Sequence, residues 1–153
     1  MSQLRQKTPR LAVRAVIVEN DRLLMVNAWP DGKSDLLCAP GGGVEVHNAL
    51  PDNLMREVYE ETGLRVEVGS VCLVNEFHDP QGAFHQVDIY FRCTITQGEI
   101  DPTWQDPENI VTTRLWVTQA ELAHLNFKPD SLPAVAFNPT DEVMYDPLEP
   151  LVR

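Results

Sequence analysis

The chain has 153 residues, of which 43% are hydrophobic and 23% charged, a composition typical of one globular domain with a buried core. Its formal net charge of −11 argues against nucleic acid as a partner, because nucleic-acid-binding proteins present basic surfaces to phosphates. No apolar run approaches the roughly 20 residues that span a bilayer, so we expect no membrane partner either.

The cysteines and the N-terminal segment bear on the cellular compartment. Cys38, Cys72 and Cys93 are far apart in the sequence, and each lies among apolar residues. This arrangement favours reduced, buried thiols over a disulfide framework or a zinc site. The segment MSQLRQKTPR is basic but is not followed by an apolar stretch, so it does not resemble a signal peptide. We therefore expect a cytoplasmic protein.

The first elements in chain order are a hairpin and a glycine-rich loop. Residues 10–28 form two arms rich in Val, Ile and Leu around Asn20-Asp21, a pair that tolerates the conformations of tight turns. A short apolar segment, LLCA, comes next, and then Pro40 and Gly41-Gly42-Gly43 interrupt the chain. We expect these glycines to form a loop.

A helix is predicted from Asn48 to Thr62. Its apolar stripe recurs every fourth residue, at Leu50, Leu54 and Val58. Asn48 is a suitable N-cap, and Gly63 is a suitable C-terminal stop.

The pattern then predicts strands at 65–77 and 84–97, a polar loop at 99–113, a last strand at 114–118 and a short helix at 119–125. The proline-rich segment 126–153 has no regular structure that we can assign. The order of elements indicates a mixed sheet with helices packed against it, in one domain.

Three carboxylates share one side of the predicted helix. At about 100° per residue, Glu57, Glu60 and Glu61 fall within one arc, which we expect to face away from the apolar stripe. Like charges at these spacings repel, and the C-terminal end of a helix disfavours anions. The simplest interpretation is a solvated acidic face in which Arg56 pairs with Glu60.

The glycine run before the helix favours a different interpretation. Glycine backbone can approach a ligand closely, and carboxylates on a rigid helix beside it suit hard divalent cations, which prefer oxygen ligands. A bound metal would make the local field positive and attract a polyphosphate to an acidic protein.

These residues resemble the Nudix box: Gly, five residues, Glu, seven residues, then Arg-Glu-apolar-x-Glu-Glu-x-Gly-apolar. With Gly42 as the first position, the second half matches in full, at Arg56, Glu57, Val58, Glu60, Glu61, Gly63 and Leu64. The resemblance extends over residues 10–125, which we take as the core of a single domain spanning 1–153, with a C-terminal extension at 126–153.

The resemblance implies an α/β fold, the Nudix α/β/α sandwich with a mixed β-sheet. It also implies a hydrolase that cleaves the pyrophosphate bond of a nucleoside diphosphate linked to another moiety, with Mg²⁺ or Mn²⁺. The partner would be a small nucleotide-type molecule. Members of the family are often dimers, which leaves a homodimer open.

One position departs from the pattern. Asn48 replaces the first Glu of the box, so the surroundings of the metal lose one carboxylate. Glu45 lies in the same loop and is a partial substitute. We expect activity to survive, because the helix glutamates are more central in the family.

The resemblance also assigns roles to the matching residues. Glu57, Glu60 and Glu61 would bind the metal, and Arg56 would orient a helix carboxylate. The backbone of Gly42 and Gly43 would contact metal or phosphate. Metal ions at such sites neutralise developing charge and lower the pKa of the attacking water.

Two roles stay open in the sequence. The general base is either Glu57 or an acid of a later loop, where Glu108 is the best candidate and Glu99 and Asp106 are rivals. Arg14 lies in an apolar strand, where it would either reach a phosphate or form an internal ion pair.

The sequence gives only weak indications of the substrate. Trp29, Phe77, Phe84 and Trp104 could stack on a base or close the core. Pro80 lies sixteen residues beyond the box, a position that in this family favours ADP-ribose-type substrates. Dinucleoside polyphosphates and nucleoside triphosphates remain alternatives.

Two other classes of function compete with an enzyme. Asn48 favours a domain of the same fold that senses nucleotides without turnover. A purely structural acidic domain would leave the glycines and the full Arg-Glu-Glu-Glu-Gly spacing without an explanation.

Overall fold

The computed structural model describes residues 8–30 and 32–152. Most of the N-terminal segment that we interpreted above lies outside this range. The strands are β1 (Arg10–Glu19), β2 (Arg22–Asn27), β3 (Leu37–Cys38), β4 (Gly41–Gly43), β5 (Arg65–His78), β6 (His85–Gln97), β7 (Arg114–Thr118), β8 (Met144–Tyr145) and β9 (Glu149–Pro150). The helices are α1 (Leu50–Thr62), α2 (Gln119–Leu122) and α3 (Leu132–Phe137).

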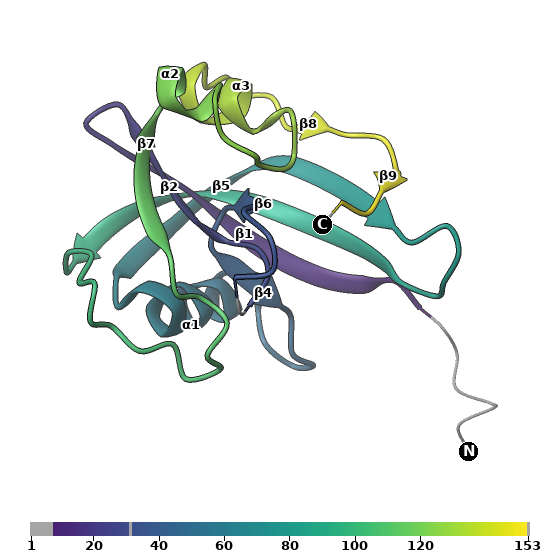
Figure 1. Ribbon diagram of the computed structural model, residues 1–153, viewed down its shortest axis with the longest axis horizontal. Helices are drawn as coiled ribbons and strands as arrows, with labels where there is room; N and C mark the ends of the chain where they lie inside the picture. Colours follow the sequence, from purple (N-terminus) through teal and green to yellow (C-terminus); the bar gives the residue numbers. More distant parts are fainter. Residues whose placement is uncertain (1–7, 31, 153) are drawn as a thin grey trace.

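The strands form a mixed sheet in the order β3-β2-β1-β6-β5-β8, with β4 on β1, β7 on β2 and β9 on β5. β1 and β6 run parallel, and β8 and β9 run parallel to β5, whereas the other pairs are antiparallel. Helix α1 lies on one side of the sheet, and α2 and α3 lie on the other (Figure 1). This arrangement confirms the predicted fold class.

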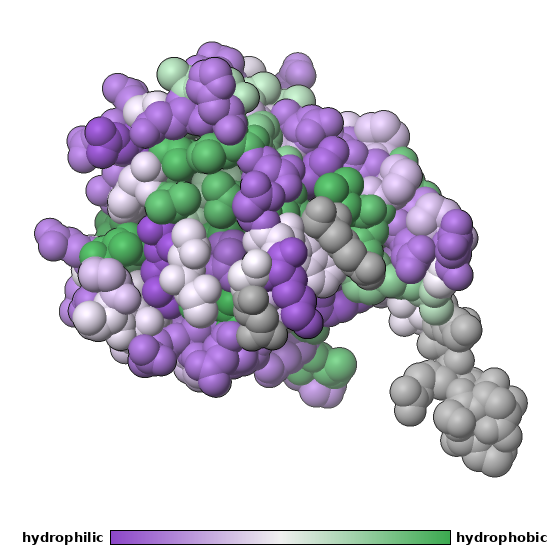
Figure 2. Space-filling model, in the orientation of Figure 1, coloured by the Kyte–Doolittle hydropathy of each residue, from purple (hydrophilic) through white to green (hydrophobic). Residues whose placement is uncertain are grey.

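Two apolar clusters occupy the two sides of the sheet. Val13, Ala15 and Ile17 of β1 pack with Leu54 and Val58 of α1. Residues of α2 and α3 pack over the opposite side, together with Val16, Leu23 and Met25. The centre of β1 is buried on both faces because alternate side chains enter different clusters. On the face shown in Figure 2, hydrophilic residues cover most of the surface between smaller hydrophobic patches.

The predicted hairpin is confirmed. Asn20 and Asp21 both have positive φ, at 51° and 61°, as a tight two-residue hairpin turn requires. The long strands at β5 and β6 also lie where the apolar pattern placed them.

Three expectations about secondary structure were wrong. The glycines form strand β4, which pairs with β1, because glycine backbone can lie against Val13 and Arg14 without a side chain between them. The strand at 114–118 is not the last, since β8 and β9 add to the edge of β5. Helix α2 ends at Leu122, before the predicted residue 125.

The start of α1 also differs from the prediction. Asn48 is exposed and does not cap the helix, whose N-cap is Ala49 and has no side-chain cap. Asn53, one turn into the helix, holds the incoming chain instead: it accepts a hydrogen bond from the backbone N–H of Glu45 and donates one to the carbonyl of Gly43. The C-terminal stop is as predicted, with Gly63 at φ 76°.

Candidate active site

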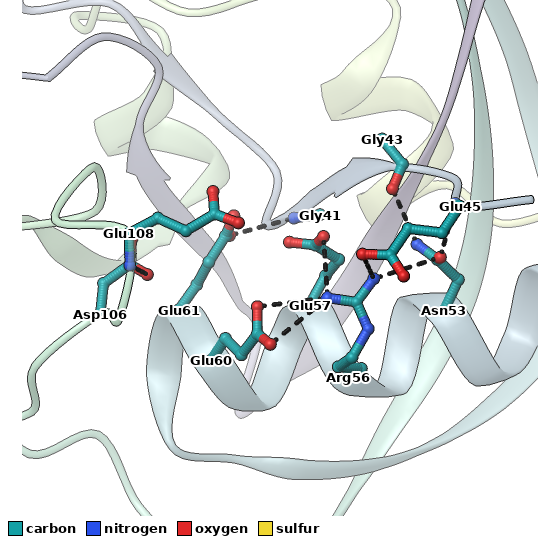
Figure 3. A network of polar contacts seen from close by, with 10 residues as sticks. All are labelled: Gly41, Gly43, Glu45, Asn53, Arg56, Glu57, Glu60, Glu61, Asp106 and Glu108. Carbon is teal, nitrogen blue, oxygen red and sulfur yellow. Dashed lines mark hydrogen bonds and ion pairs between the residues drawn. The ribbon is translucent and has the colours of Figure 1, made fainter.

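Helix α1 brings two of its glutamates against the glycine strand. Glu57 is buried, with 8% exposure, and its carboxylate lies over Gly42. Glu61 is half-buried and accepts a hydrogen bond of 3.1 Å from the backbone N–H of Gly41. The expectation that these carboxylates face away from the apolar stripe was wrong. They flank it, because the same helix packs both on the sheet and on β4. Figure 3 shows Glu57 and Glu61 on the side of α1 that faces the glycine strand.

Each glycine of β4 leaves room for a particular neighbour. A Cβ at Gly41 would lie 2.0 Å from the carbonyl oxygen of Val13, which β1 cannot move. A Cβ at Gly42 would lie 2.6 Å from Oε2 of Glu57, and one at Gly43 would lie 2.5 Å from Nη2 of Arg10. The close approach of Val13, Glu57 and Arg10 leaves no room for a side chain at any of the three positions.

Arg56 is surrounded by carboxylates. Its guanidinium lies 3.3 Å from Glu60, 3.4 Å from Glu57 and 3.4 Å from Glu45. It also donates to Oδ1 of Asn53, which holds the loop before the helix. Arg56 therefore contacts helix carboxylates, and Glu45 reaches the same guanidinium from the loop before the helix.

A cavity of about 440 Å³ opens between α1, β4 and the loop before β7. Its lining includes Glu57, Glu61, Glu108 and the three glycines. Glu60 does not line it and is directed toward Arg56 (Figure 3). Among the described residues, no group of three or more His, Cys, Asp or Glu side chains is arranged so that it could hold a metal ion.

Burial makes the charged forms of Glu57 and Glu61 unfavourable, and so raises the pKa of both carboxyl groups. Burial raises the pKa of Glu61 to about 8, although Arg14 and the Gly41 N–H oppose the shift. Burial also raises the pKa of Glu57, and Arg56 opposes that shift while Glu108 and Glu60 add to it. Buried carboxylates with too little positive charge nearby fit a hard divalent cation, because carboxylate and carbonyl oxygens are the ligands such ions prefer.

The three loop acids have different surroundings. Glu108 lines the cavity, and its charge contributes to the raised pKa of Glu57. Asp106 is buried and accepts the backbone N–H groups of Glu108, Ile110 and Val111 at 2.8 to 3.1 Å, so its carboxylate shapes the loop. Glu99 is exposed and lines neither cavity described here.

A second cavity, of about 270 Å³, adjoins the first and is lined by aromatic side chains. Trp29, Phe77 and Phe84 all contribute to its wall. Trp104 does not: it packs edge-on against Tyr59 and donates to the carbonyl of Glu60. Of the four aromatic residues singled out in the sequence, three therefore meet at one cavity.

Arg14 lies between the two cavities and pairs internally. Its Nε is 3.4 Å from Oδ2 of Asp88, and it donates to the carbonyl of Ala39. Burial alone would lower the pKa of Arg14, but Asp88 and Cys38 raise it. The internal ion pair is thus present, and because Arg14 also lines both cavities, a phosphate contact stays open.

The C-terminal segment folds back over the second cavity. Leu151 and Val152 line it, and β8 and β9 attach this segment to β5. Asp146 accepts hydrogen bonds from Asn75 and from Ser131. The C-terminal segment therefore contacts the second cavity.

Several polar residues at this site were not predicted from the sequence. Asn53 fixes the loop before α1, and Gln86 and Asp88 form a buried pair at 2.7 Å beneath the arginines. Asp146 fastens the C-terminal segment. A polar residue within an apolar strand was the only signal for Gln86 and Asp88.

Other expectations concern the surroundings of the site. All three cysteines are free, as expected, and Cys38 lines both cavities. Pro80 lies in the exposed turn between β5 and β6 and lines neither cavity. Within residues 8–30 and 32–152, no helix is both long and apolar enough to cross a membrane.

Comparisons with known proteins identify relatives of this chain. The chain is 30% identical over 114 residues to mouse nucleoside diphosphate-linked moiety X motif 6, which covers 68% of this chain and 34% of the mouse protein. It is 28% identical over 92 residues to an ADP-ribose pyrophosphatase of Methanocaldococcus jannaschii, covering 60% of this chain and 54% of the relative. The chain thus spans about a third to a half of the length of these curated relatives.

A solved structure of a UDP-X diphosphatase superposes with a TM-score of 0.72 at 21% identity, covering 94% of this chain and 70% of the other, which supports the fold. The family model of the NUDIX domain matches residues 8–136. This span includes β4, α1, and Arg10 and Arg14, which line both cavities. The chain belongs to the Nudix domain family.

Proposed function

We propose that this protein is a metal-dependent hydrolase that cleaves the pyrophosphate bond of a nucleoside diphosphate linked to another moiety. The observation that carries the proposal is the pair Glu57 and Glu61, two carboxylates that line a cavity beside a glycine strand and have raised pKa values. Membership of the Nudix family supports the reaction class.

Glu57 and Glu61 would hold Mg²⁺ or Mn²⁺, with Glu60 as a further ligand if it leaves Arg56. Such an ion neutralises charge on the phosphates and lowers the pKa of a bound water. The backbone of Gly42 and Gly43 bounds the cavity where phosphate oxygens would lie. Arg56 holds Glu57 and Glu60 in place through the contacts described above.

The general base is Glu57 or Glu108 in this proposal. Both line the same cavity, and a base must lie within hydrogen-bond reach of the attacking water, directly or through a second one. Asp106 is a weaker candidate because its oxygens already accept backbone N–H groups. Glu99 is a weaker candidate because it lies outside the cavity.

ADP-ribose is the first substrate to test. The name of the Methanocaldococcus jannaschii relative and the position of Pro80 support it. The aromatic cavity formed by Trp29, Phe77 and Phe84 is suited to a planar base, since base stacking on aromatic rings is favourable whatever the base.

The alternative is a domain that binds nucleotides without turnover. Asn48 supports it, and so does the pairing of Glu60 with Arg56, which keeps the three helix glutamates from gathering around one point. In that case ligand binding would persist while hydrolysis would be absent.

The decisive experiment measures hydrolysis with Mg²⁺ and with Mn²⁺ across ADP-ribose, diadenosine polyphosphates, NADH and the nucleoside triphosphates. We expect Glu57→Gln to lower kcat by several orders of magnitude while the protein stays folded, with a Tm no lower than that of the wild type. Glu67→Gln, at an exposed position of β5 outside both cavities, is the matched control. If Glu57→Gln keeps more than a tenth of the rate, Glu57 has no part in the mechanism.

A further inference from the structure

Arg10 differs from Arg14 and Lys128, the other cations that line the two cavities, in that it has no carboxylate partner. Arg14 is paired with Asp88, Arg56 with three glutamates, and Lys128 with Asp130 and Glu149. Among the ion pairs of the described residues, none involves Arg10. Its side-chain partner is the neutral amide of Gln86, which accepts from Nη1 at 2.6 Å.

The position of Arg10 is set by three neighbours. Gln86 is buried, and it is itself held by Asp88 at 2.7 Å, so the acceptor of the guanidinium cannot easily move. On the other side, the guanidinium lies against the backbone of Gly43, where any side chain would collide with it. Arg10 is therefore an ordered cation, although it is exposed.

Arg10 also lies where the two cavities meet. It lines both the acidic cavity with Glu57 and Glu61 and the aromatic cavity with Trp29, Phe77 and Phe84. A molecule with its base in the aromatic cavity and its reacting phosphate in the acidic one must pass Arg10. The guanidinium keeps donors free after its bond to Gln86, because it has five N–H groups.

We propose that Arg10 binds the phosphate that links the base-bearing half of the substrate to the reacting phosphate, with Gln86 as its positioning residue and Gly43 as the residue that leaves it room. This inference rests on the proposed function and names a binding residue for it. Arg10 would select ligands with a phosphate at the junction over uncharged nucleosides. It also adds positive charge where the two cavities meet, in a protein of net charge −11.

The first test separates binding from catalysis. Arg10→Met is compared with wild type and with Arg22→Met, a control at an exposed arginine of β2 that lines neither cavity. We expect Arg10→Met to raise KM for ADP-ribose by about tenfold to a hundredfold, the effect of losing one charge-assisted hydrogen bond, with kcat within about threefold. Arg10→Lys should recover part of the loss, because it keeps the charge without the planar donors.

The second test uses the glycine. Gly43→Ala should push the end of the flexible Arg10 side chain away from Gln86 and so raise KM in the same way. In the Arg10→Met background the same alanine should then have little further effect. Additive effects of the two substitutions would show that Gly43 acts independently of Arg10 and would contradict the proposed arrangement.

The third test does not depend on turnover. Calorimetry of ADP binding in EDTA should show weaker binding to Arg10→Met than to Arg22→Met. Added salt should also lower the ADP affinity of Arg10→Met less than that of Arg22→Met, because one cation that salt screens is gone. Equal ADP affinity and equal KM in the two variants would overturn the role of Arg10. A loss confined to kcat, with ADP affinity unchanged, would overturn it too. If wild type hydrolyses nothing in the panel, the enzyme proposal fails, but this binding test still decides the inference.

Discussion

Because Gly42 has no side chain, the carboxylate of Glu57 can lie directly over its backbone. A Cβ at this position would lie 2.6 Å from Oε2 and 2.7 Å from Cδ of Glu57, so Gly42→Ala must displace that carboxylate. Because the displaced atoms end a flexible side chain, we expect the fold to persist and kcat/KM to fall by about a hundredfold, the loss typical of a misplacement of about 1 Å. Steady-state kinetics and a melting curve measure the two effects.

Gly82→Ala is a matched control for this substitution. Its Cβ would meet Oδ2 of Asp79 at 2.9 Å, so it perturbs the end of another carboxylate, but in an exposed turn outside both cavities. Equal losses of activity in the two variants would indicate a general effect of the added methyl group. The role assigned to Gly42 requires that activity falls in Gly42→Ala and not in Gly82→Ala.

At this scale, the sequence allowed some residues to be identified and not others. Glu57 and Glu61 could be proposed from the sequence because their spacing and the glycines before them form one short, local pattern. Arg10 and Gln86 could not, because they are separated by 76 positions and meet only when β1 pairs with β6. Asn48 was assigned as the cap from its residue type, whereas Asn53 makes the contacts that hold the loop.

The strands and helices whose apolar residues recur at a regular spacing could be predicted from the sequence. Strands β1, β2, β5 and β6 and helix α1 all lie where the pattern placed them, within a few residues. Strand β4 has no such period, because glycine carries no side chain to repeat. Strands β8 and β9 have two residues each and exist only by pairing with the edge of β5, which local sequence does not reveal.

The C-terminal segment yields a prediction about an element. Asp146→Ala removes the acceptor of two hydrogen bonds, from Asn75 and Ser131, and leaves the buried Asn75 with one partner fewer. We expect faster hydrogen exchange in residues 144–151 and a higher KM for base-bearing substrates, because Leu151 and Val152 wall the aromatic cavity. Asp141→Ala, at an exposed residue of the same segment, is the control. An unchanged KM in a loosened segment would show that this wall does not contact substrate.

For the whole molecule, the net charge of −11 and the buried glutamates both oppose folding to some degree, and a bound cation would relieve both. Specific binding must therefore be distinguished from screening of the overall charge. Mg²⁺ at the site stabilises only the folded state, by about 1.4 kcal/mol at a concentration ten times its Kd, which corresponds to a rise in Tm of about 3 to 6 °C. KCl at matched ionic strength screens charge without occupying the site.

We therefore expect millimolar Mg²⁺ to raise Tm of the wild type above its value in KCl of equal ionic strength. The double variant Glu57→Gln, Glu61→Gln should start from a higher Tm in the absence of metal, since neutral amides are less costly to bury than carboxylates with raised pKa values. It should also lose the additional rise with Mg²⁺. If Mg²⁺ and KCl act alike on the wild type, the glutamates bind no metal in the free protein, and any ion would have to arrive together with the phosphates of the substrate.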